Sequence, residues 1–310
     1  MSVVPASFLA RAARSESWAD WLAKLPRLIA DVCSEWRLGV EGPAMTGATA
    51  LVLPVRTENG EPAVLKLGWP HPEATYEHLA LRAWAGEGAV RLLRADPRRQ
   101  VLLLERADPG HDLHQLPIME ACEVIAGLYP KLHGPTLPQL DRLSAHAGRW
   151  AEELADLRRT QRVPRRFVDQ AISLASDFAS DPQTDDGLIH TDLHFANVLA
   201  AAREPWLAID PKPLTGEPAY EVAPVLWNRW DEAIATGDIR AAVLSRMFTL
   251  IDHGGLDEDR VRSWVMVREM VNVHGAIVGD ETDGSAPVEE SAEDAAWITA
   301  ALTIVKAAQR

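Results

Sequence analysis

Cysteine is scarce in this sequence, and long apolar runs are missing from it. The two cysteines, Cys33 and Cys122, lie far apart and lack metal-site spacing, so we expect reduced thiols in a cytoplasmic protein. No apolar run approaches the roughly 20 residues needed to cross a bilayer. The first residues, MSVVPASFLARAARSESW, contain no basic entry into a long apolar stretch. The sequence therefore predicts neither a signal peptide nor a membrane as a partner.

Positive charge is also in short supply. The chain has 31 Lys and Arg residues against 45 Asp and Glu residues, which gives a net charge of -14. A surface this negative repels phosphate backbones, so we expect no nucleic-acid partner. The charge favours a cationic small molecule through its long-range field, although solubility alone accounts for it equally well. The oligomeric state stays open.

Apolar residues are plentiful enough for two lobes, since they make up 47% of 310 residues. In the first part of the chain we expect one or two helices within 15–37, broken near Pro26, and then a small sheet. The expected strands span 46–57, 62–68, 90–95 and 101–105, and one crossing helix spans 73–86. Asn59-Gly60 is a strong two-residue turn signal, so the first two strands are predicted to form a hairpin.

The rest of the chain is predicted to be mainly helical. Residues 106–115 are polar and turn-rich, which is typical of a hinge. The candidate helices span 119–133, 138–160, 164–180, 220–233, 237–253, 257–279 and 289–308, with short strands at 187–189 and 206–209. We therefore predict an α+β protein with a sheet-based N-lobe at 1–105 and a larger helical C-lobe at 116–310.

The segment richest in chemistry is LIHTDLHFANVLAAAREPWLAID, residues 188–210. A short apolar strand leads into Asp192, Asn197 follows five residues later, and a second apolar strand ends at Asp210. Mg²⁺ prefers oxygen ligands and keeps several waters, so one carboxylate, one amide and substrate phosphates suffice to hold it. The other carboxylate can accept the proton of an attacking hydroxyl group.

The pattern His190-x-Asp192-x₄-Asn197, followed by Asp210, resembles the catalytic loop of the aminoglycoside phosphotransferase branch of the protein-kinase-like fold. Similarity to the streptomycin 6-phosphotransferase and hydroxyurea phosphotransferase subfamily runs through HPEATYEHLALRAWAGEGAVRLLRADPRRQVLLLERADPG (71–110) and REPWLAIDPKPLTGEPAYEVAPVLWNRWDE (203–232). The resemblance covers residues 40–235 and implies a bilobal kinase that uses ATP and Mg²⁺.

The resemblance also implies roles for single residues. Asp192 would orient and deprotonate the acceptor hydroxyl, and Asn197 and Asp210 would hold Mg²⁺ on the ATP phosphates. These roles agree with the chemistry of the residues themselves, because phosphoryl transfer depends on positioning and charge neutralisation.

The same resemblance implies a nucleotide site in the N-lobe. Lys66 would contact the α- and β-phosphates and pair with Glu77, for which Glu73 is the alternative. The backbone from Glu105 to Ala107 would bond the edge of the adenine ring. The spacing supports the Lys66–Glu77 pair, because Lys66 ends a strand that leads into the helix bearing Glu77.

Several positions depart from the pattern of similar sequences. The sequence has no G-x-G-x-x-G over the phosphates, and the candidate loop, Thr46-Gly47-Ala48-Thr49, has one glycine. Thr191 stands where a glycine commonly precedes the catalytic aspartate, and Phe195-Ala196 replaces Pro-Gly. These departures keep open a non-catalytic nucleotide-binding protein as an alternative.

Other residues near the loop allow two interpretations each. His190 and His194 are expected to support the loop, but His190-x-Asp192-x-His194 also resembles the ligand cluster of a metal hydrolase. Lys212 is either a surface lysine or a phosphate contact. Trp227 and Trp230 are expected to pack in the core, with stacking on a sugar ring as the alternative.

The acceptor is the least constrained part of the prediction. Streptomycin carries guanidinium groups and would need acidic residues, for which Glu221, Asp231 and Glu269 are candidates. Hydroxyurea is small and neutral and needs no such residues. The net charge favours a cationic aminocyclitol. Phosphorylation of streptomycin is therefore the first hypothesis, and phosphorylation of another small hydroxyl acceptor is the second.

Overall fold

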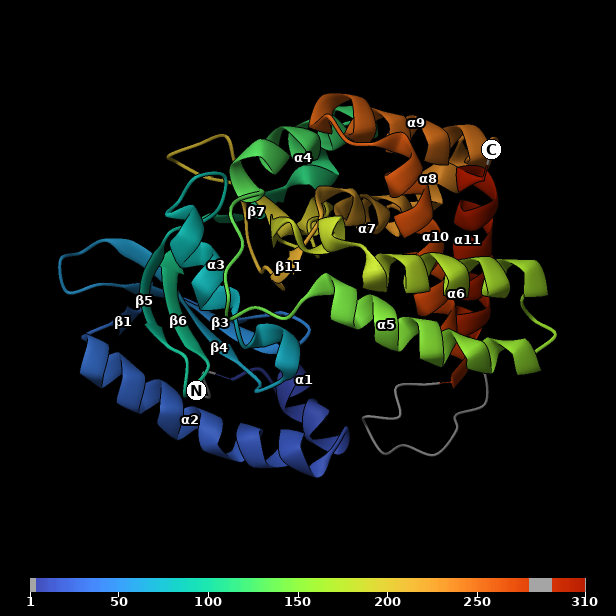
Figure 1. The fold of residues 1–310 in the computed structure, drawn as a ribbon. Coiled ribbons are helices and arrows are strands. Elements are labelled where there is room, and N and C mark those ends of the chain that lie inside the picture. Colours follow the sequence, from blue (N-terminus) through green and yellow to red (C-terminus); the bar gives the residue numbers. More distant parts are fainter. Residues whose placement is uncertain (1–3, 279–291, 310) are drawn as a thin grey trace. The chain divides into compact units, whose positions relative to one another are not determined.

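The computed structural model describes residues 4–278 and 292–309 (Figure 1). The chain forms two compact units, Met1–Asp108 with Ala201–Leu207 and Pro109–Ala200 with Ala208–Arg310. The boundary after Asp108 falls inside the expected hinge. The expected lobes placed 201–207 in the helical part, whereas the structure places this segment in the first unit. The physical reason is Arg203, which forms an ion pair with Glu105 and donates to the carbonyl oxygen of Ala89.

The first unit is built on an antiparallel sheet with strand order β1-β3-β4-β6-β5, and β2 pairs with β3. The strands are β1 (Gly39–Val40), β2 (Met45–Thr46), β3 (Ala50–Arg56), β4 (Pro62–Gly68), β5 (Leu92–Asp96) and β6 (Val101–Glu105). The predicted hairpin is confirmed as β3–β4, and Gly60 takes the positive φ of 81° that its turn requires. Its first arm is shorter than expected, because a turn at 47–49 separates β2 from β3.

The helix α2 (Glu16–Trp36) shares a hydrophobic core with one face of this sheet (Figure 1). Leu22, Leu25 and Ile29 of the helix belong to the same buried cluster as Leu51 and Leu65 of the hairpin. The predicted break at Pro26 is wrong, since the helix runs through this residue. Pro26 lies on the exposed side, so the packed leucine and isoleucine side chains offset the roughly 3 kcal/mol that an internal proline costs.

The crossing helix is shorter than its predicted span. A short 3-10 helix, η2 (Pro72–Ala74), precedes α3 (Glu77–Trp84), and Ala85 ends the helix with a left-handed φ of 50°. The interruption places Glu77 at the first position of α3. This position suits a carboxylate, because the N-terminus of a helix favours negative charge.

The second unit is mainly helical. Its helices are α4 (Ile118–Leu132), α5 (Leu143–Glu153), α6 (Arg165–Ser180), α7 (Ala223–Trp227), α8 (Trp230–Ala235), α9 (Ile239–Gly254), α10 (Glu258–Val278) and α11 (Ala292–Ala308). The single helix predicted at 220–233 is wrong, because Arg229 adopts a left-handed φ of 53° and divides α7 from α8. The predicted start of the last helix at 289 lies outside the described residues.

Short strands flank the loop that carries Asp192 and Asn197 in the second unit. β8 (Gly187–Ile189) pairs with β11 (Leu214–Gly216), and β9 (Val198–Ala200) pairs with β7 (Asp108–Asp112), a strand within the expected hinge. β10 (Trp206–Ala208) carries the chain back from the first unit. No helix in the described part of the chain is long and apolar enough to cross a membrane.

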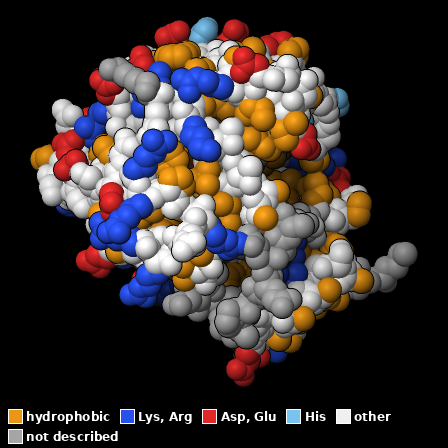
Figure 2. Space-filling view, turned by 90° about the vertical axis from the view of Figure 1, so that its right-hand side faces the viewer, with side chains coloured by type: hydrophobic (Ala, Val, Ile, Leu, Met, Phe, Trp, Pro, Cys, Tyr) orange, Lys and Arg blue, Asp and Glu red, His pale blue; other side chains and the backbone are white. Residues whose placement is uncertain are grey.

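Charge is distributed unevenly over the surface. Although the net charge is -14, Lys and Arg side chains gather on the face drawn in Figure 2, beside apolar patches. The acidic excess of the sequence is therefore not a uniform negative field, and attraction of a cation depends on particular side chains.

Candidate active site

Backbone hydrogen bonds hold the three predicted site segments together. The N–H of Ile209 donates to the carbonyl of Asn197 at 2.9 Å, and the N–H of Lys212 donates to the carbonyl of His190 at 3.0 Å. The pairing of β8 with β11 adds a third connection. Asp210 therefore lies in a turn that is bonded on both sides to the loop carrying Asp192 and Asn197.

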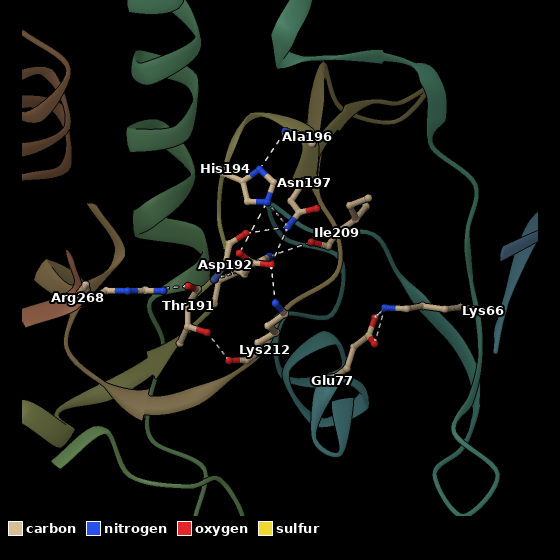
Figure 3. A network of polar contacts seen from close by, with 11 residues as sticks. Lys66, Glu77, Thr191, Asp192, His194, Ala196, Asn197, Ile209, Lys212 and Arg268 are labelled. Carbon is tan, nitrogen blue, oxygen red and sulfur yellow. Dashed lines mark hydrogen bonds and ion pairs between the residues drawn. The ribbon is translucent and has the colours of Figure 1, made fainter. Parts of the chain in front are cut away.

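Asp192 and Asn197 lie in direct contact (Figure 3). The amide nitrogen of Asn197 donates to the backbone carbonyl of Asp192 at 2.8 Å and lies 3.3 Å from its Oδ2 atom. Since the nitrogen takes these contacts, the amide oxygen of Asn197 remains as the group suited to a cation. The carboxylate of Asp192 is partly exposed, so a substrate hydroxyl group can reach it.

Lys212 completes the arrangement. Its Nζ atom lies 3.2 Å from Oδ2 of Asp192, with 39% and 23% of the two side chains exposed (Figure 3). From the sequence alone, Lys212 could be interpreted either as a surface lysine or as a phosphate contact. In the structure its ammonium group lies beside Asp192, the candidate base, where it can form a charge-assisted hydrogen bond to a phosphoryl group.

Thr191 holds a backbone conformation that β-branched residues rarely adopt, with a φ of 63°. Its Oγ1 atom donates to the carbonyl of Lys212 at 2.6 Å, and its N–H donates to Oε1 of Glu221 at 2.6 Å. Arg268 donates to its carbonyl at 3.1 Å. Three hydrogen bonds therefore hold a strained conformation next to Asp192, and such a conformation persists only where the surrounding structure over-determines it. This φ explains why glycine suits the position.

Glu221 supports this loop from behind. Its side chain is fully buried, and its Oε2 atom lies 3.8 Å from Nε2 of His133. Burial by itself raises the pKa of Glu221, but the His133 and His190 rings and the Thr191 N–H together lower it by more, so the net pKa falls below the usual value. This placement differs from the expected acceptor contact, because a carboxylate at 0% exposure cannot face an incoming molecule.

His190 is a brace inside the second unit. The ring is fully buried, with Nε2 3.0 Å from the carbonyl of Ile209, and Nδ1 accepts from the N–H of Asp192 at 3.3 Å. Burial lowers the pKa of His190, so the neutral ring is favoured. Both ring nitrogens are directed to backbone groups, which leaves neither for a metal ion.

His194 caps the short 3-10 helix η6 (Phe195–Asn197), because its Nδ1 atom accepts from the N–H of Ala196 at 3.3 Å. Its Nε2 atom lies 3.7 Å from Oδ1 of Asp192. Burial lowers the pKa of His194. Within residues 4–278 and 292–309, no three His, Cys, Asp or Glu side chains form a group that could hold a metal ion alone, so the hydrolase interpretation gains no support.

The predicted lysine–glutamate pair is present in the first unit. Nζ of Lys66 lies 2.7 Å from both carboxylate oxygens of Glu77, and 13% and 5% of these side chains are exposed. Lys66 projects from β4, between Val52 of β3 and Leu102 of β6. Glu73, the alternative partner, lies exposed on η2. The pair fixes an ammonium group on the less buried face of the sheet.

The expected adenine and phosphate segments have different environments. The carboxylate of Glu105 accepts hydrogen bonds from the Arg203 side chain and from the N–H of Arg91. Burial raises the pKa of Glu105, but the Arg203 side chain, the Arg91 N–H and the charges of both arginines together lower it by more, so the net pKa is below the usual value. Ala107 is half-buried, whereas Thr46 and Gly47 are exposed. The Glu105 side chain is therefore engaged within the first unit, and its N–H also donates to the carbonyl of Arg91 at 2.9 Å.

The remaining expected acceptor residues also differ from one another. Asp231 is exposed on α8, whereas Glu269 of α10 is fully buried. Burial raises the pKa of Glu269 to about 8, despite opposing contributions from Asn272 and Arg268. This carboxyl is therefore largely neutral at pH 7 and supplies no negative charge to a cationic acceptor.

Two basic residues, one in each unit, were not predicted from the sequence. Arg268 bonds the loop at Thr191, and its guanidinium group lies over Tyr220 and Trp227, with the group 4.2 Å and 5.3 Å from the two ring centroids. Arg11 donates to the turn at 47–49 in the first unit. Trp227 thus packs against protein groups, as expected. Neither arginine carries a sequence signal, because each partner is distant along the chain.

Sequence comparison adds an independent line of information. Residues 35–276 match the family described as aminoglycoside/hydroxyurea antibiotic resistance kinase. The chain is 38% identical to streptomycin 6-kinase of Streptomyces glaucescens over 93% of its own length and 92% of the relative's. It is 40% identical to hydroxyurea phosphotransferase of Kitasatospora aureofaciens over 82% of its length and 73% of the relative's.

Structure comparison gives the fold. A crystal structure of spectinomycin phosphotransferase in complex with ADP and spectinomycin superimposes with a TM-score of 0.60. The match covers 91% of this chain and 97% of that chain, at 13% sequence identity. At this identity the likeness establishes the fold alone, which is the expected protein-kinase-like α+β fold of aminoglycoside phosphotransferases.

Proposed function

Because this chain belongs to the aminoglycoside/hydroxyurea antibiotic resistance kinase family, we propose that it inactivates a cationic aminocyclitol antibiotic by ATP-dependent phosphorylation. Streptomycin is the first acceptor to test, since a streptomycin 6-kinase is similar over nearly the whole chain. The observation that carries the proposal is the contact of Asp192 with both Asn197 and Lys212.

In this proposal Asp192 orients the acceptor hydroxyl group and receives its proton. The hydroxyl oxygen forms a bond to the γ-phosphorus of ATP while the bond to the β-γ bridging oxygen breaks, and ADP leaves. Lys212 balances negative charge beside the reacting groups, at 3.2 Å from the carboxylate. Thr191, fixed by three hydrogen bonds, keeps Asp192 in place.

The residues present suit a magnesium ion. Asn197 directs its amide nitrogen to Asp192, which leaves its amide oxygen for a cation, and Asp210 lies in the turn that is bonded on both sides to the loop of Asp192. These two oxygen donors would hold Mg²⁺, which prefers oxygen ligands. When bound, the ion would neutralise charge on the ATP phosphates. Lys66, held by Glu77, would contact the α- and β-phosphates, and the backbone of 105–107 would bond the adenine edge.

A second acceptor, hydroxyurea, is favoured by one structural observation. Of the three acidic residues expected to meet a cationic acceptor, Glu221 is enclosed behind the loop and Glu269 is buried and neutral at pH 7. This leaves Asp231 as the exposed carboxylate of the set. A small neutral acceptor needs no acidic residues.

The test is a coupled assay of ADP release with streptomycin, hydroxyurea, a sugar and an amino alcohol as acceptors. We expect ADP release only when an acceptor is present, with streptomycin turned over fastest. Asp192→Asn should lower kcat on the order of a hundredfold or more, with ATP still bound. Turnover of hydroxyurea alone would replace the acceptor. ATP binding without any turnover would support the non-catalytic alternative, and unchanged kcat in D192N would overturn the mechanism.

A further inference from the structure

The turn between β2 and β3 is held by an arginine from the start of the chain. One guanidinium nitrogen of Arg11, Nη1, lies 2.7 Å from the carbonyl oxygen of Gly47 and 2.6 Å from that of Ala48. The turn is closed by the N–H of Gly47, which donates to the carbonyl of Ala50 at 2.9 Å. Arg11 lies on the 3-10 helix η1 (Ala10–Ala13), before the residues that match the family. Two successive carbonyl groups of the turn thus point to one cation.

Peptide geometry turns this contact into an orientation of N–H groups. In a planar trans peptide the C=O and the following N–H point in opposite directions. Because the carbonyls of Gly47 and Ala48 face Arg11, the N–H groups of Ala48 and Thr49 face away from it. Neither N–H has a hydrogen-bond acceptor among the residues that the structure describes. Successive N–H groups directed to one side form a concave site that suits an anion.

Arg11 itself is fixed by the core of the first unit. Its guanidinium carbon lies 4.5 Å from the ring centroid of Phe8 and 6.0 Å from that of Trp18. Both rings are buried in the cluster shared with the sheet. Cation–π contacts with these two buried rings thus hold the guanidinium group of Arg11 in place.

The turn also lies next to the strand that bears Lys66. β3 begins at Ala50, directly after the turn, and its residue Val52 pairs with Lys66 of β4. Trp69 donates its N–H to the carbonyl of Thr49 at 2.7 Å, so the turn is bonded to the chain just beyond β4. Two N–H donors and one ammonium group are therefore presented by neighbouring parts of one sheet.

We propose that Arg11 is a positioning residue for the nucleotide, which holds the turn at 47–49 so that its N–H groups bind the phosphates of ATP. Arg11 thereby replaces, with one cation from the N-terminal segment, the conformational role of the glycine-rich loop that the sequence lacks. This inference rests on the proposed use of ATP and names how the phosphates are recognised.

The experiment compares nucleotides with and without phosphates. Calorimetry would measure the affinity of ATP, ADP and adenosine for the full chain and for Arg11→Ala. We expect R11A to lose roughly tenfold in affinity for ATP and ADP, as for the loss of about one charge-assisted hydrogen bond, with adenosine affinity unchanged. In the acceptor assay KM for ATP should rise by a similar factor while KM for the acceptor stays the same.

Two further variants keep the test decisive. Arg14→Ala removes a neighbouring cation that stacks on Trp18, with 5.6 Å from its guanidinium carbon to the ring centroid, and should leave ADP affinity within about twofold. Arg11→Lys retains the charge and most of the stem, so it should fold even if R11A does not. It should still weaken ADP, because one ammonium group satisfies two carbonyls less well than a guanidinium group does.

The outcomes separate the inference from the proposed function. Wild-type ADP affinity in a folded R11A or R11K variant would overturn the role of Arg11 and leave the kinase proposal untouched. An equal loss of adenosine and ADP affinity would also overturn it, since this indicates general damage to the fold. Absence of nucleotide binding in the wild-type chain would contradict the proposed function itself.

Discussion

The ammonium group of Lys212 lies 3.2 Å from Oδ2 of Asp192. Lys212 follows the candidate metal ligand Asp210 by two residues in the sequence. This ion pair places a cation at the carboxylate that we propose receives the acceptor proton. We therefore predict that Lys212→Met lowers kcat roughly ten- to a hundredfold, because charge stabilisation at the reacting groups is lost. Steady-state kinetics with saturating ATP would measure the change.

A matched control for this prediction is Lys131→Met, which removes an exposed lysine from the last turn of α4. It should leave kcat unchanged. Lys212→Arg keeps the charge with a different geometry and should retain part of the rate. If K212M turned over the acceptor as fast as wild type, the ion pair would have no role in the reaction.

The Lys66–Glu77 pair permits a test that separates stability from ATP use. Glu77→Gln removes the carboxylate charge that lies 2.7 Å from the ammonium group of Lys66, whose side chain is only 13% exposed. We expect this to reduce the free energy of unfolding by about 3 kcal/mol, as for the loss of one partner of a buried pair, and to raise KM for ATP. Urea unfolding and steady-state kinetics would measure the two effects.

The double variant Lys66→Met with Glu77→Gln is the control for that pair. Removing both charges should restore most of the free energy of unfolding, because no buried charge remains unpaired. KM for ATP should nevertheless stay high, since the lysine is absent. Recovery of both stability and ATP use in the double variant would show that Lys66 has no contact with the nucleotide.

The sequence predicted those parts of the site that depend on short spacings. Asp192 and Asn197 lie on one loop, and the lysine and glutamate of the ion pair are eleven residues apart. The positive φ of Thr191 and the ion pair of Lys212 could not be predicted, because they depend on chain segments that meet only in the folded protein. The residue type alone gives no sign of such contacts.

The errors of the sequence analysis have physical causes of the same kind. Pro26 predicted a break, but it faces solvent while its neighbours pack in the core. Glu221 and Glu269 were expected at the acceptor because a guanidinium-bearing molecule would need acidic residues there, but both are buried. Burial depends on how helices far apart in the sequence pack, so composition cannot distinguish a surface carboxylate from an enclosed one.

Glu221 leads to a prediction on pH and stability. Its folded pKa is lower than usual, so its contribution to stability is complete above the unfolded pKa of about 4.3 and is lost as pH falls through the folded value. We therefore expect Glu221→Gln to lower the free energy of unfolding at pH 7 by about 1.5–3 kcal/mol, the range for a hydrogen bond to a charged group. Denaturant unfolding at neutral and acid pH would measure it.

The difference between E221Q and wild type should shrink as the pH falls below about 4.3, since wild-type Glu221 is then protonated as well. In the acceptor assay kcat should fall while KM for ATP changes little, because the Thr191 N–H loses its anionic partner. Equal stability of the two proteins at pH 7 would contradict a supporting role for this carboxylate.

For Glu269 we predict that the contribution to the free energy of unfolding changes with pH in the opposite direction. Burial raises its folded pKa to about 8, so the folded protein keeps a proton that the unfolded chain releases above about 4.3. A raised folded pKa contributes stability that is complete below the unfolded value and is lost as pH rises through the folded value. Relative to Glu269→Gln, which stays neutral, wild type should lose up to about 4 kcal/mol between acid pH and pH 7.

Urea unfolding of wild type and E269Q at several values of pH would test this dependence. Because glutamine brings its own hydrogen-bonding needs, the informative quantity is the change of the difference with pH rather than its value at one pH. Glu152→Gln, at an exposed position of α5, is the control and should show no such slope. Parallel stability curves for wild type and E269Q from acid to alkaline pH would mean that Glu269 ionises normally, and hence that it could supply charge to a cationic acceptor after all.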